Sequence, residues 1–292
     1  MVRGKSLSKP RSFLDKFIPY LLISPALVYL VFFIGYPLIQ AILLAFFDDM
    51  GRPTLEYIQI LLNDIYFSDA VKYTLLLASV AIPIQLAIAV ALALLINTKI
   101  RGYNAFLYIY TIPLVLSDIA AATIWYTLLA SYGLINRVII SLGGEKIYFL
   151  SSRHPELQFF SIVVAEVWRA TAIVFVIVLA GLQTIPRDLI EAAEVFGATA
   201  LQRLRHIVLP LLKPSIQAAL LIRTLFAMQV FATAWVLTGR SIPVLAGEAY
   251  YWYTELLNPH VAAIYGLIIA GITIVIGILY IKFLRLKHLE GV

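Results

Sequence analysis

The sequence predicts an all-α integral membrane protein with six membrane-spanning helices. Three observations support this prediction: the composition, the length of the apolar segments and the placement of the basic residues. Of the 292 residues, 62% are hydrophobic and 13% are charged, whereas a soluble domain carries about 25% charged residues. We therefore expect hydrocarbon to be the solvent for most of the surface. The chain has no cysteine, which excludes disulfides and thiolate metal sites.

Six segments are long and apolar enough to cross a bilayer, which takes about 20 residues. They cover residues 17–47, 70–97, 103–130, 159–183, 211–238 and 261–284. The first segment is longer than a crossing requires and contains Pro25 and Pro37, so we expect it to bend. Basic residues precede it, as in a signal peptide, but its apolar run is too long for one. We expect it to remain as the first span.

The Lys and Arg residues predict the orientation, because cytoplasmic flanks of spans are enriched in them. One set of flanks carries Arg3, Lys5, Lys9, Arg11, Lys16, Lys99, Arg101, Arg187, Arg203, Arg205, Lys213, Lys282, Arg285 and Lys287. The other set carries Arg52, Lys72, Arg137, Lys146, Arg153 and Arg240. The first set, with both termini, is predicted to be cytoplasmic. The predicted organisation is a cytoplasmic tail at 1–16, a six-span domain at 17–284 and a cytoplasmic tail at 285–292.

Residues 185–210, between the fourth and fifth spans, form a predicted cytoplasmic connector of two short helices. Pro186 suits the first turn of a helix, and Gly197 suits the left-handed backbone that ends one. A second helix is predicted to start near Thr199 and to end at Pro210. The residue types leave two interpretations open: an amphipathic connector on the membrane surface, or a surface that docks into another protein.

The spacing within this connector resembles the EAA loop of permease subunits of ATP-binding cassette (ABC) importers. That loop has Glu-Ala-Ala, three residues, Gly, nine residues, Ile, one residue and Leu-Pro. The chain fills these positions with Glu191, Ala192, Ala193, Gly197, Ile207, Leu209 and Pro210. It departs from the family at Phe196, where Asp is frequent, and at residues 239–243 (GRSIP), where a Gly-Gly-Pro run is usual.

Three longer segments resemble the carbohydrate-uptake branch of that family, the maltose, trehalose and glycerol-phosphate type. They are SPALVYLVFFIGYPLIQAILLAFFD, IPLVLSDIAAATIWYTLLASYGLINRVI and VWRATAIVFVIVLAGLQTIPRDLIEAAEVFGA. The resemblance implies the type I ABC importer permease fold. In that fold, the EAA loop is a coupling helix that docks into an ATPase subunit.

The resemblance also implies a set of partners in the cell membrane. They are a second homologous permease subunit, two cytoplasmic ABC ATPase subunits, an extracellular solute-binding protein and a small-molecule sugar as substrate. The sequence contains no GxxxxGK[ST] phosphate-binding loop. We therefore expect ATP and Mg to bind the partner ATPase, and we expect no cofactor, enzyme activity or nucleic-acid partner for this chain.

Three charged residues, Glu166, Arg169 and Arg223, fall inside predicted spans, where a charge costs about 3 kcal/mol. They suit either a structural ion pair of Glu166 with one arginine or a lining of the substrate path. In the resembling family, ligand contacts lie on the two spans that flank the EAA loop. The candidate path residues are Glu166, Arg169, Arg223, Phe226, Ala227 and Val230. The last four recur at the spacing of one helix face.

Other features leave their interpretation open. Asp118, near the external half of the third span, suits the path or the membrane interface. The predicted external loop 239–260 carries an aromatic cluster, EAYYWYTELLN, which suits an interfacial belt or a docking surface for an extracellular partner. The alternative function is an ion-driven secondary transporter, which would need relay carboxylates and inverted repeats. An intramembrane enzyme would need histidines within spans, and the four histidines are scattered.

Overall fold

The computed structural model describes residues 13–98 and 101–283, and the predicted tails lie largely outside them. In the described part the chain is helical, with no β-strand beyond one bridge between Phe47 and Pro53. Six helical segments there are long and apolar enough to cross a membrane, as predicted. They are Phe17–Phe46, Phe67–Asn97, Asp118–Ser141, Pro155–Gln183, Ala200–Ala227 and Pro259–Tyr280.

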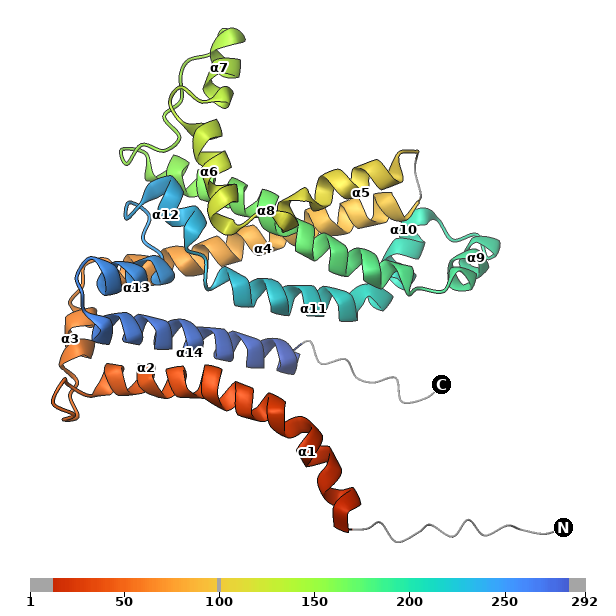
Figure 1. Ribbon diagram of the computed structural model, residues 1–292. Helices are drawn as coiled ribbons and strands as arrows, with labels where there is room; N and C mark the ends of the chain where they lie inside the picture. The colour runs from red at the N-terminus through yellow and green to blue at the C-terminus, as the bar shows by residue number, and fades with distance from the viewer. Residues whose placement is uncertain (1–12, 99–100, 284–292) are drawn as a thin grey trace.

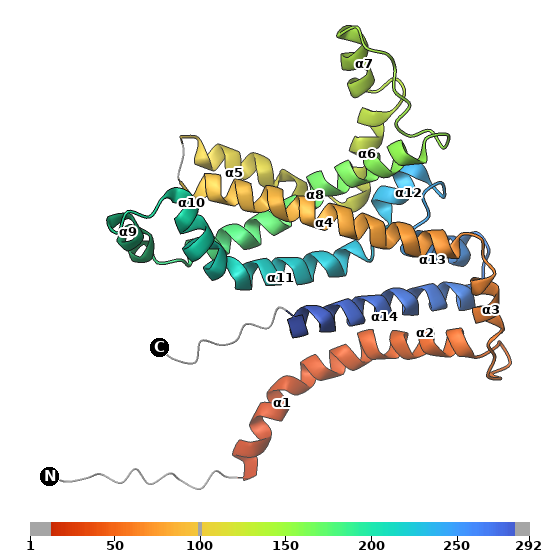
Figure 2. The ribbon, with the colours of Figure 1, turned by 180° about the vertical axis from the view of Figure 1, so that it is seen from behind.

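The first span bends, as its two prolines predict. It runs through α1 (Phe13–Leu30), a π-helical segment η1 (Val31–Gly35) and α2 (Tyr36–Phe46). The helix curves along this stretch in Figures 1 and 2, because prolines and π turns both interrupt the regular hydrogen-bond ladder. α2 packs against α14 (Pro259–Phe283), whereas the large apolar side chains of α1 from Phe17 onward are exposed.

The centre of the bundle is formed by α4 (Phe67–Asn97) and α8 (Pro155–Gln183), with α11 (Leu209–Ala227) packed against both. Gly181 on α8 faces Ser215 on α11 so closely that a Cβ atom at position 181 would lie 2.1 Å from the Ser215 Oγ atom. Small residues are typical of helix interfaces in membranes, where close backbone packing replaces the hydrophobic effect as the source of association.

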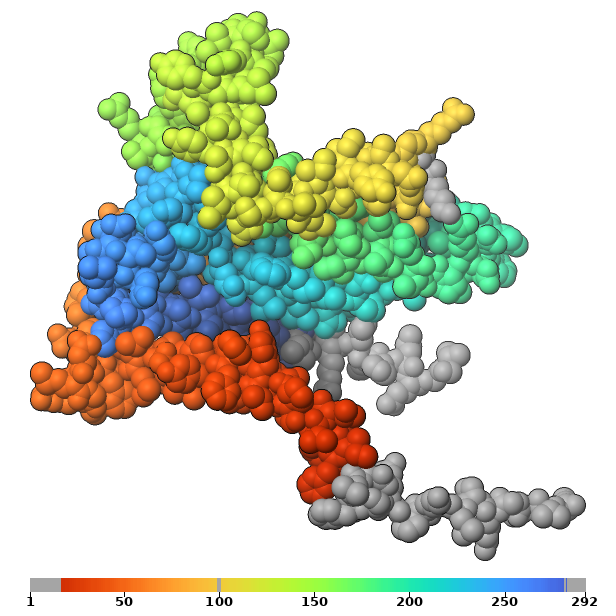
Figure 3. Space-filling model, viewed as in Figure 1, coloured from red at the N-terminus to blue at the C-terminus, as the bar shows by residue number. Residues whose placement is uncertain are grey.

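The third predicted span, residues 103–130, is not one helix. It is divided into α5 (Tyr103–Thr111), a 3-10 segment η2 (Ile112–Val115) and α6 (Asp118–Leu129). Pro113 cannot donate to a helical ladder, and the Ser117 side chain caps the next helix by accepting a hydrogen bond from the Ala120 N–H (3.2 Å). α6 therefore takes a new direction and, with α7 (Leu134–Ser141), projects from the body of the molecule (Figures 1 and 3).

The fifth predicted span, residues 211–238, also differs from the prediction. α10 (Ala200–Arg203), a π-helical segment η3 (Leu204–Val208) and α11 form one continuous helix, so Pro210 does not end a helix. The π segment has already interrupted the regular ladder just before the proline, so its missing N–H costs little. α11 then stops at Ala227, and the chain turns before α12 (Ala232–Thr238).

Both interruptions place non-helical backbone within membrane-spanning segments. Such backbone is stable only where protein covers it or where it lines a water-filled cavity, because lipid cannot satisfy free N–H and C=O groups. Met228 and Val230 in the second interruption are buried by protein, whereas Val115 in the first is exposed in the described chain.

Arg240 connects several elements at the end of the bundle that is predicted to be external. It lies in the loop between α12 and α13 (Leu245–Thr254). Arg240 donates hydrogen bonds to the Glu248 carboxylate (2.6 and 3.0 Å), and its guanidinium lies between the rings of Tyr66 and Tyr251 (3.9 and 3.7 Å). Burial alone would lower the pKa of Arg240, but the hydrogen bonds and the charge of Glu248 outweigh it, and the pKa is raised.

The aromatic cluster of residues 248–258 is divided between packing and exposure. The Trp252 Nε1–H donates to Asp64 (3.0 Å), just before α4, and the same carboxylate accepts a hydrogen bond from the Tyr265 hydroxyl (3.1 Å). Tyr253 and Leu257 are exposed. Part of the cluster therefore fastens α13 to its neighbours, and only the remaining part can meet a lipid or protein surface.

Candidate functional site

The main polar feature inside the bundle is a cluster centred on Glu166 of α8, whose side chain is 2% exposed. Its carboxylate accepts hydrogen bonds from Arg223 Nη2 (2.8 Å), Thr233 Oγ1 (2.5 Å) and Arg169 Nη2 (3.2 Å). A buried carboxylate is stable only when it is paired and hydrogen-bonded. The three donors meet that requirement.

Gln85 of α4 completes the buried part of the cluster. Its Oε1 atom accepts a hydrogen bond from Arg223 Nε (2.6 Å), and its Nε2–H donates to the main-chain oxygen of Glu166 (3.1 Å). Sequence reasoning missed Gln85 and Thr233. An amide in the middle of an apolar span was a signal for Gln85, whereas a threonine near a helix start carries no such signal.

Arg169 extends the cluster to Asp118, at the first turn of α6. Its Nη1 atom lies 2.6 Å from Asp118 Oδ1, and the two side chains are 18% and 60% exposed. Because Arg169 lies midway between Pro155 and Gln183, Asp118 is level with the middle of α8. The ion pair thus places Asp118 beside the middle of α8 rather than beside one of its ends.

The cluster joins the two interrupted spans to the centre of the bundle. Asp118 begins α6 after the first interruption, and Arg223 and Thr233 lie on either side of the second. Two carboxylates face two guanidinium groups, so the formal charges balance. The same side chains thus neutralise one another and hold α4, α6, α8, α11 and α12 together.

The stripe predicted from Arg223 to Val230 is not one helix face. α11 ends at Ala227, so Val230 lies in the turn that follows. Ala227 and Val230 are buried in apolar packing, whereas Phe226 is exposed. The spacing rule fails here because it assumes a helix that continues.

The connector at residues 185–210 contains the two predicted helices, although the second continues past Pro210. α9 (Arg187–Val195) ends before Gly197, whose φ of +79° is the left-handed backbone expected there. Thr199 and Gln202 cap α10 reciprocally: the Thr199 Oγ1 atom accepts from the Gln202 N–H (3.3 Å), and the Gln202 Oε1 atom accepts from the Thr199 N–H (2.8 Å). An ion pair between Glu194 and Arg203 ties the two helices.

α9 stands out from one end of the bundle (Figures 1 and 2), and none of its residues is buried. Among the predicted coupling residues, Glu191 and Ala192 are exposed and Ala193 is half-buried. Phe196, where the resembling family often has Asp, is 89% exposed, and Val195 and Leu201 beside it are also exposed. Large apolar side chains gathered on a protruding tip mark an interaction surface.

The other predicted coupling residues lie nearer to the fifth span, in the helix that follows α10. Ile207 is half-buried, whereas Leu209 and Pro210 are exposed on the continuous helix that leads into α11. They lie on the second helix of the pair, which continues into the fifth span.

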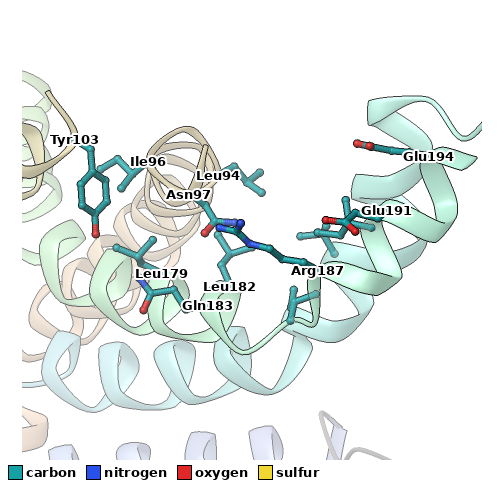
Figure 4. Close-up of a pocket in the computed structure, with 13 residues that line it drawn as sticks. Leu94, Ile96, Asn97, Tyr103, Leu179, Leu182, Gln183, Arg187, Glu191 and Glu194 are labelled. Atoms are coloured by element: carbon teal, nitrogen blue, oxygen red, sulfur yellow. The ribbon is translucent and has the colours of Figure 1, made fainter. Parts of the chain in front are cut away.

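A pocket of about 620 Å³ lies between α9 and the nearby ends of α4, α5 and α8. Its polar lining is Asn97, Tyr103, Gln183, Arg187, Glu191 and Glu194. In Figure 4 the Arg187 side chain extends toward Asn97, while Glu191 and Glu194 project from successive turns of α9. The pocket lies between α9 and the spans, and Ile190 of α9 packs against the apolar core beside it.

Comparison with known proteins agrees with this architecture. The family described as "Binding-protein-dependent transport system inner membrane component" matches residues 73–286. The trehalose/maltose transport system permease protein MalF of Thermococcus litoralis is 33% identical over 229 residues, which are 75% of this chain and 76% of that protein. The trehalose transport system permease protein SugA of Mycobacterium tuberculosis is 30% identical over 235 residues, 78% of this chain and 75% of that protein.

Among solved structures, a bacterial alginate ABC transporter in complex with alginate pentasaccharide-bound periplasmic protein has a chain of the same fold. The TM-score is 0.84 at 23% identity, over 97% of this chain and 100% of that chain. The matched family region covers five of the six spans, the charge cluster and the connector. The chain therefore belongs to the family of inner membrane components of binding-protein-dependent transport systems and is a membrane-spanning permease subunit.

Proposed function

We propose that this permease imports a sugar or oligosaccharide that an extracellular solute-binding protein delivers. Two relatives at 30% identity or above, from an archaeon and a bacterium, are permeases of trehalose or maltose transport systems. The polar cluster within the spans supplies hydroxyl-binding chemistry at the depth where a translocated solute must pass. A second homologous permease subunit completes the path.

The energy comes from ATP hydrolysed by two cytoplasmic ATPase subunits, and the connector at 185–210 transmits it. The observation that carries this proposal is the tip of the connector. Val195, Phe196 and Leu201 are exposed there, around the turn between α9 and α10, and the Glu194–Arg203 ion pair links the two helices. The second helix continues into α11, so a displacement of the tip reaches the fifth span through that helix.

Within the cluster, the buried and exposed parts have different roles. Glu166 and Arg223 satisfy each other and are closed to a ligand, so they hold the spans together. Arg169 and Phe226 reach the surface of the described chain and line the substrate path. Ala227 and Val230 pack behind them.

The connector and both termini are cytoplasmic, which follows from the distribution of Lys and Arg. No observation favours the ion-driven alternative. The Glu166 carboxylate is held by three hydrogen-bond donors, and the chain belongs to a family of binding-protein-dependent transport systems.

Reconstitution tests the proposal. The permease pair, the ATPase subunits and the binding protein are placed in proteoliposomes, and uptake of radiolabelled trehalose and maltose is measured. We expect uptake that needs ATP, the ATPase subunits and the binding protein together. Uptake driven by a proton or sodium gradient without the ATPase subunits would contradict the proposal.

A further inference from the structure

The position of Asp118 bears on the charge of the transported solute, which membership of the family does not specify. Its Oδ1 atom lies 2.6 Å from Nη1 of Arg169, which is midway along the 29-residue helix α8. A helix of that length extends about 43 Å, and the hydrocarbon core of a bilayer is about 30 Å thick. Asp118 therefore lies inside the membrane rather than at its surface.

At that depth the Asp118 side chain is still 60% exposed. Lipid tails cannot solvate a carboxylate, and charged residues within spans face a bundle interior or a water-filled cavity. The exposed side of Asp118 must therefore face water or protein. In the proposed importer, the path supplies such a water-filled surface at this depth.

We propose that Asp118 contacts the substrate, accepting hydrogen bonds from hydroxyl groups of a neutral saccharide and disfavouring acidic saccharides. The proposal rests on the proposed function of sugar import. Arg169 holds Asp118 through Oδ1 alone, and Oδ2 has no hydrogen-bond partner among the described residues. An ionised carboxylate accepts several hydrogen bonds, so Oδ2 remains available to sugar hydroxyls.

The charge balance of the cluster decides between neutral and acidic sugars. Both guanidinium groups, on Arg169 and Arg223, are already bound to carboxylates, so neither is free for an acidic substrate. A uronic acid would instead meet the exposed negative charge of Asp118, and like charges at close range repel each other. The Arg169 Nε–H lacks an acceptor within the described chain but is buried, so it is out of reach of a solute.

Thiol accessibility tests this proposal, because the chain has no cysteine of its own. Asp118→Cys and Tyr126→Cys, the latter at an exposed position about two turns further along α6 on the side of Asp118, are assembled with cysteine-free partners and treated with a cationic methanethiosulfonate. We expect both to react in at least one nucleotide state. Val28→Cys, exposed on the first span, is the control and should not react, because it faces lipid or packed protein.

Selectivity is read from protection of Tyr126→Cys. Trehalose should slow its modification at least tenfold, and dimannuronate, an acidic disaccharide of similar size, should not do so at the same concentration. With Asp118→Asn added, the two sugars should protect within about twofold of each other, and Asp118→Glu should restore the difference. Equal protection with Asp118 present, or an unreactive Asp118→Cys in every nucleotide state, would overturn the proposal. If ATP-driven uptake is absent, the proposed function fails; if uptake occurs without this protection pattern, only the role of Asp118 fails.

Discussion

Arg223 and Glu166 lie 57 residues apart in sequence and form an ion pair of 2.8 Å with side chains that are 3% and 2% exposed. The pair connects α11 to α8 at the level where the third and fifth spans are interrupted. The fifth span is not a continuous helix at that level. The Glu166 carboxylate links its two parts, because it accepts hydrogen bonds from Arg223 before the interruption and from Thr233 after it.

Removing one member of this pair should cost more than removing both. Arg223→Met or Glu166→Gln alone strands a buried polar group, and breaking a buried pair costs about 3–5 kcal/mol. We expect each single variant to lower the membrane level and the thermal unfolding temperature of the purified subunit. The double variant should recover part of the loss, and two single variants with wild-type stability would show that the pair is not structural.

Close packing of α8 on α11 predicts a cost at Gly181. A Cβ atom there would lie 2.1 Å from Ser215 Oγ, so Gly181→Ala should destabilise the protein by about 1–3 kcal/mol, the usual cost of overpacking. Gly277→Ala on α14 is the matched control, because nothing lies within 4 Å of its added Cβ atom. Thermal unfolding in detergent compares the two, and equal midpoints would contradict the packing argument.

Gly197 is expected to be essential for the shape of the connector. Its φ of +79° is unfavourable for a β-branched residue, and Gly197→Val should cost about 1–2 kcal/mol locally and tilt α9. We expect a marked loss of ATPase co-purification. Gly143→Val is the matched control: φ is +84° there and no atom lies within 4 Å, but the residue is at the opposite, predicted external end. Equal retention of the ATPase by both variants would exclude the connector as the docking surface.

Phe196 tests what kind of surface the ATPase presents. Its side chain is 89% exposed, so Phe196→Asp should leave the stability of the permease unchanged. If docking buries this ring, the variant should lose about 1.5–3 kcal/mol of binding, roughly a tenfold or greater weakening of ATPase association. Leu142→Asp, equally exposed beyond α7, should bind the ATPase normally. Normal binding by Phe196→Asp would place the ring outside the interface.

The orientation of the chain is testable with impermeant thiol reagents. Cysteines replacing Ser141 and Ser241, both exposed, should react in intact cells. A cysteine replacing Thr199 should react only after the membrane is opened, because the basic flanks place the connector in the cytoplasm. Labelling of Thr199→Cys in intact cells would reverse the assigned orientation.

The sequence by itself determined the features that depend on neighbouring residues. Apolar length gave the number of spans and located the first, second, fourth and sixth, the prolines at 25 and 37 predicted the bend in the first, and the spacing from Glu191 to Pro210 pointed to the permease family. Gly197 was assigned its left-handed backbone correctly, because that conformation depends on the residue type and on the helix end before it. Each of these features depends on residues that are close together in the sequence, so spacing and composition are sufficient to predict it.

Only the tertiary structure decided which of those residues meet. Gln85 and Arg223 are 138 residues apart, yet they share a hydrogen bond of 2.6 Å, and no periodicity relates them. The interruptions at Pro113 and after Ala227 moved Val230 off the face predicted for it and placed Asp118 beside the middle of α8. The physical reason is that a hydrophobic pattern constrains which side of a helix avoids water. The position of a helix break depends on whether the polar groups that it frees find hydrogen-bond partners elsewhere in the bundle. The same requirement determines which distant charged side chains pair near the break.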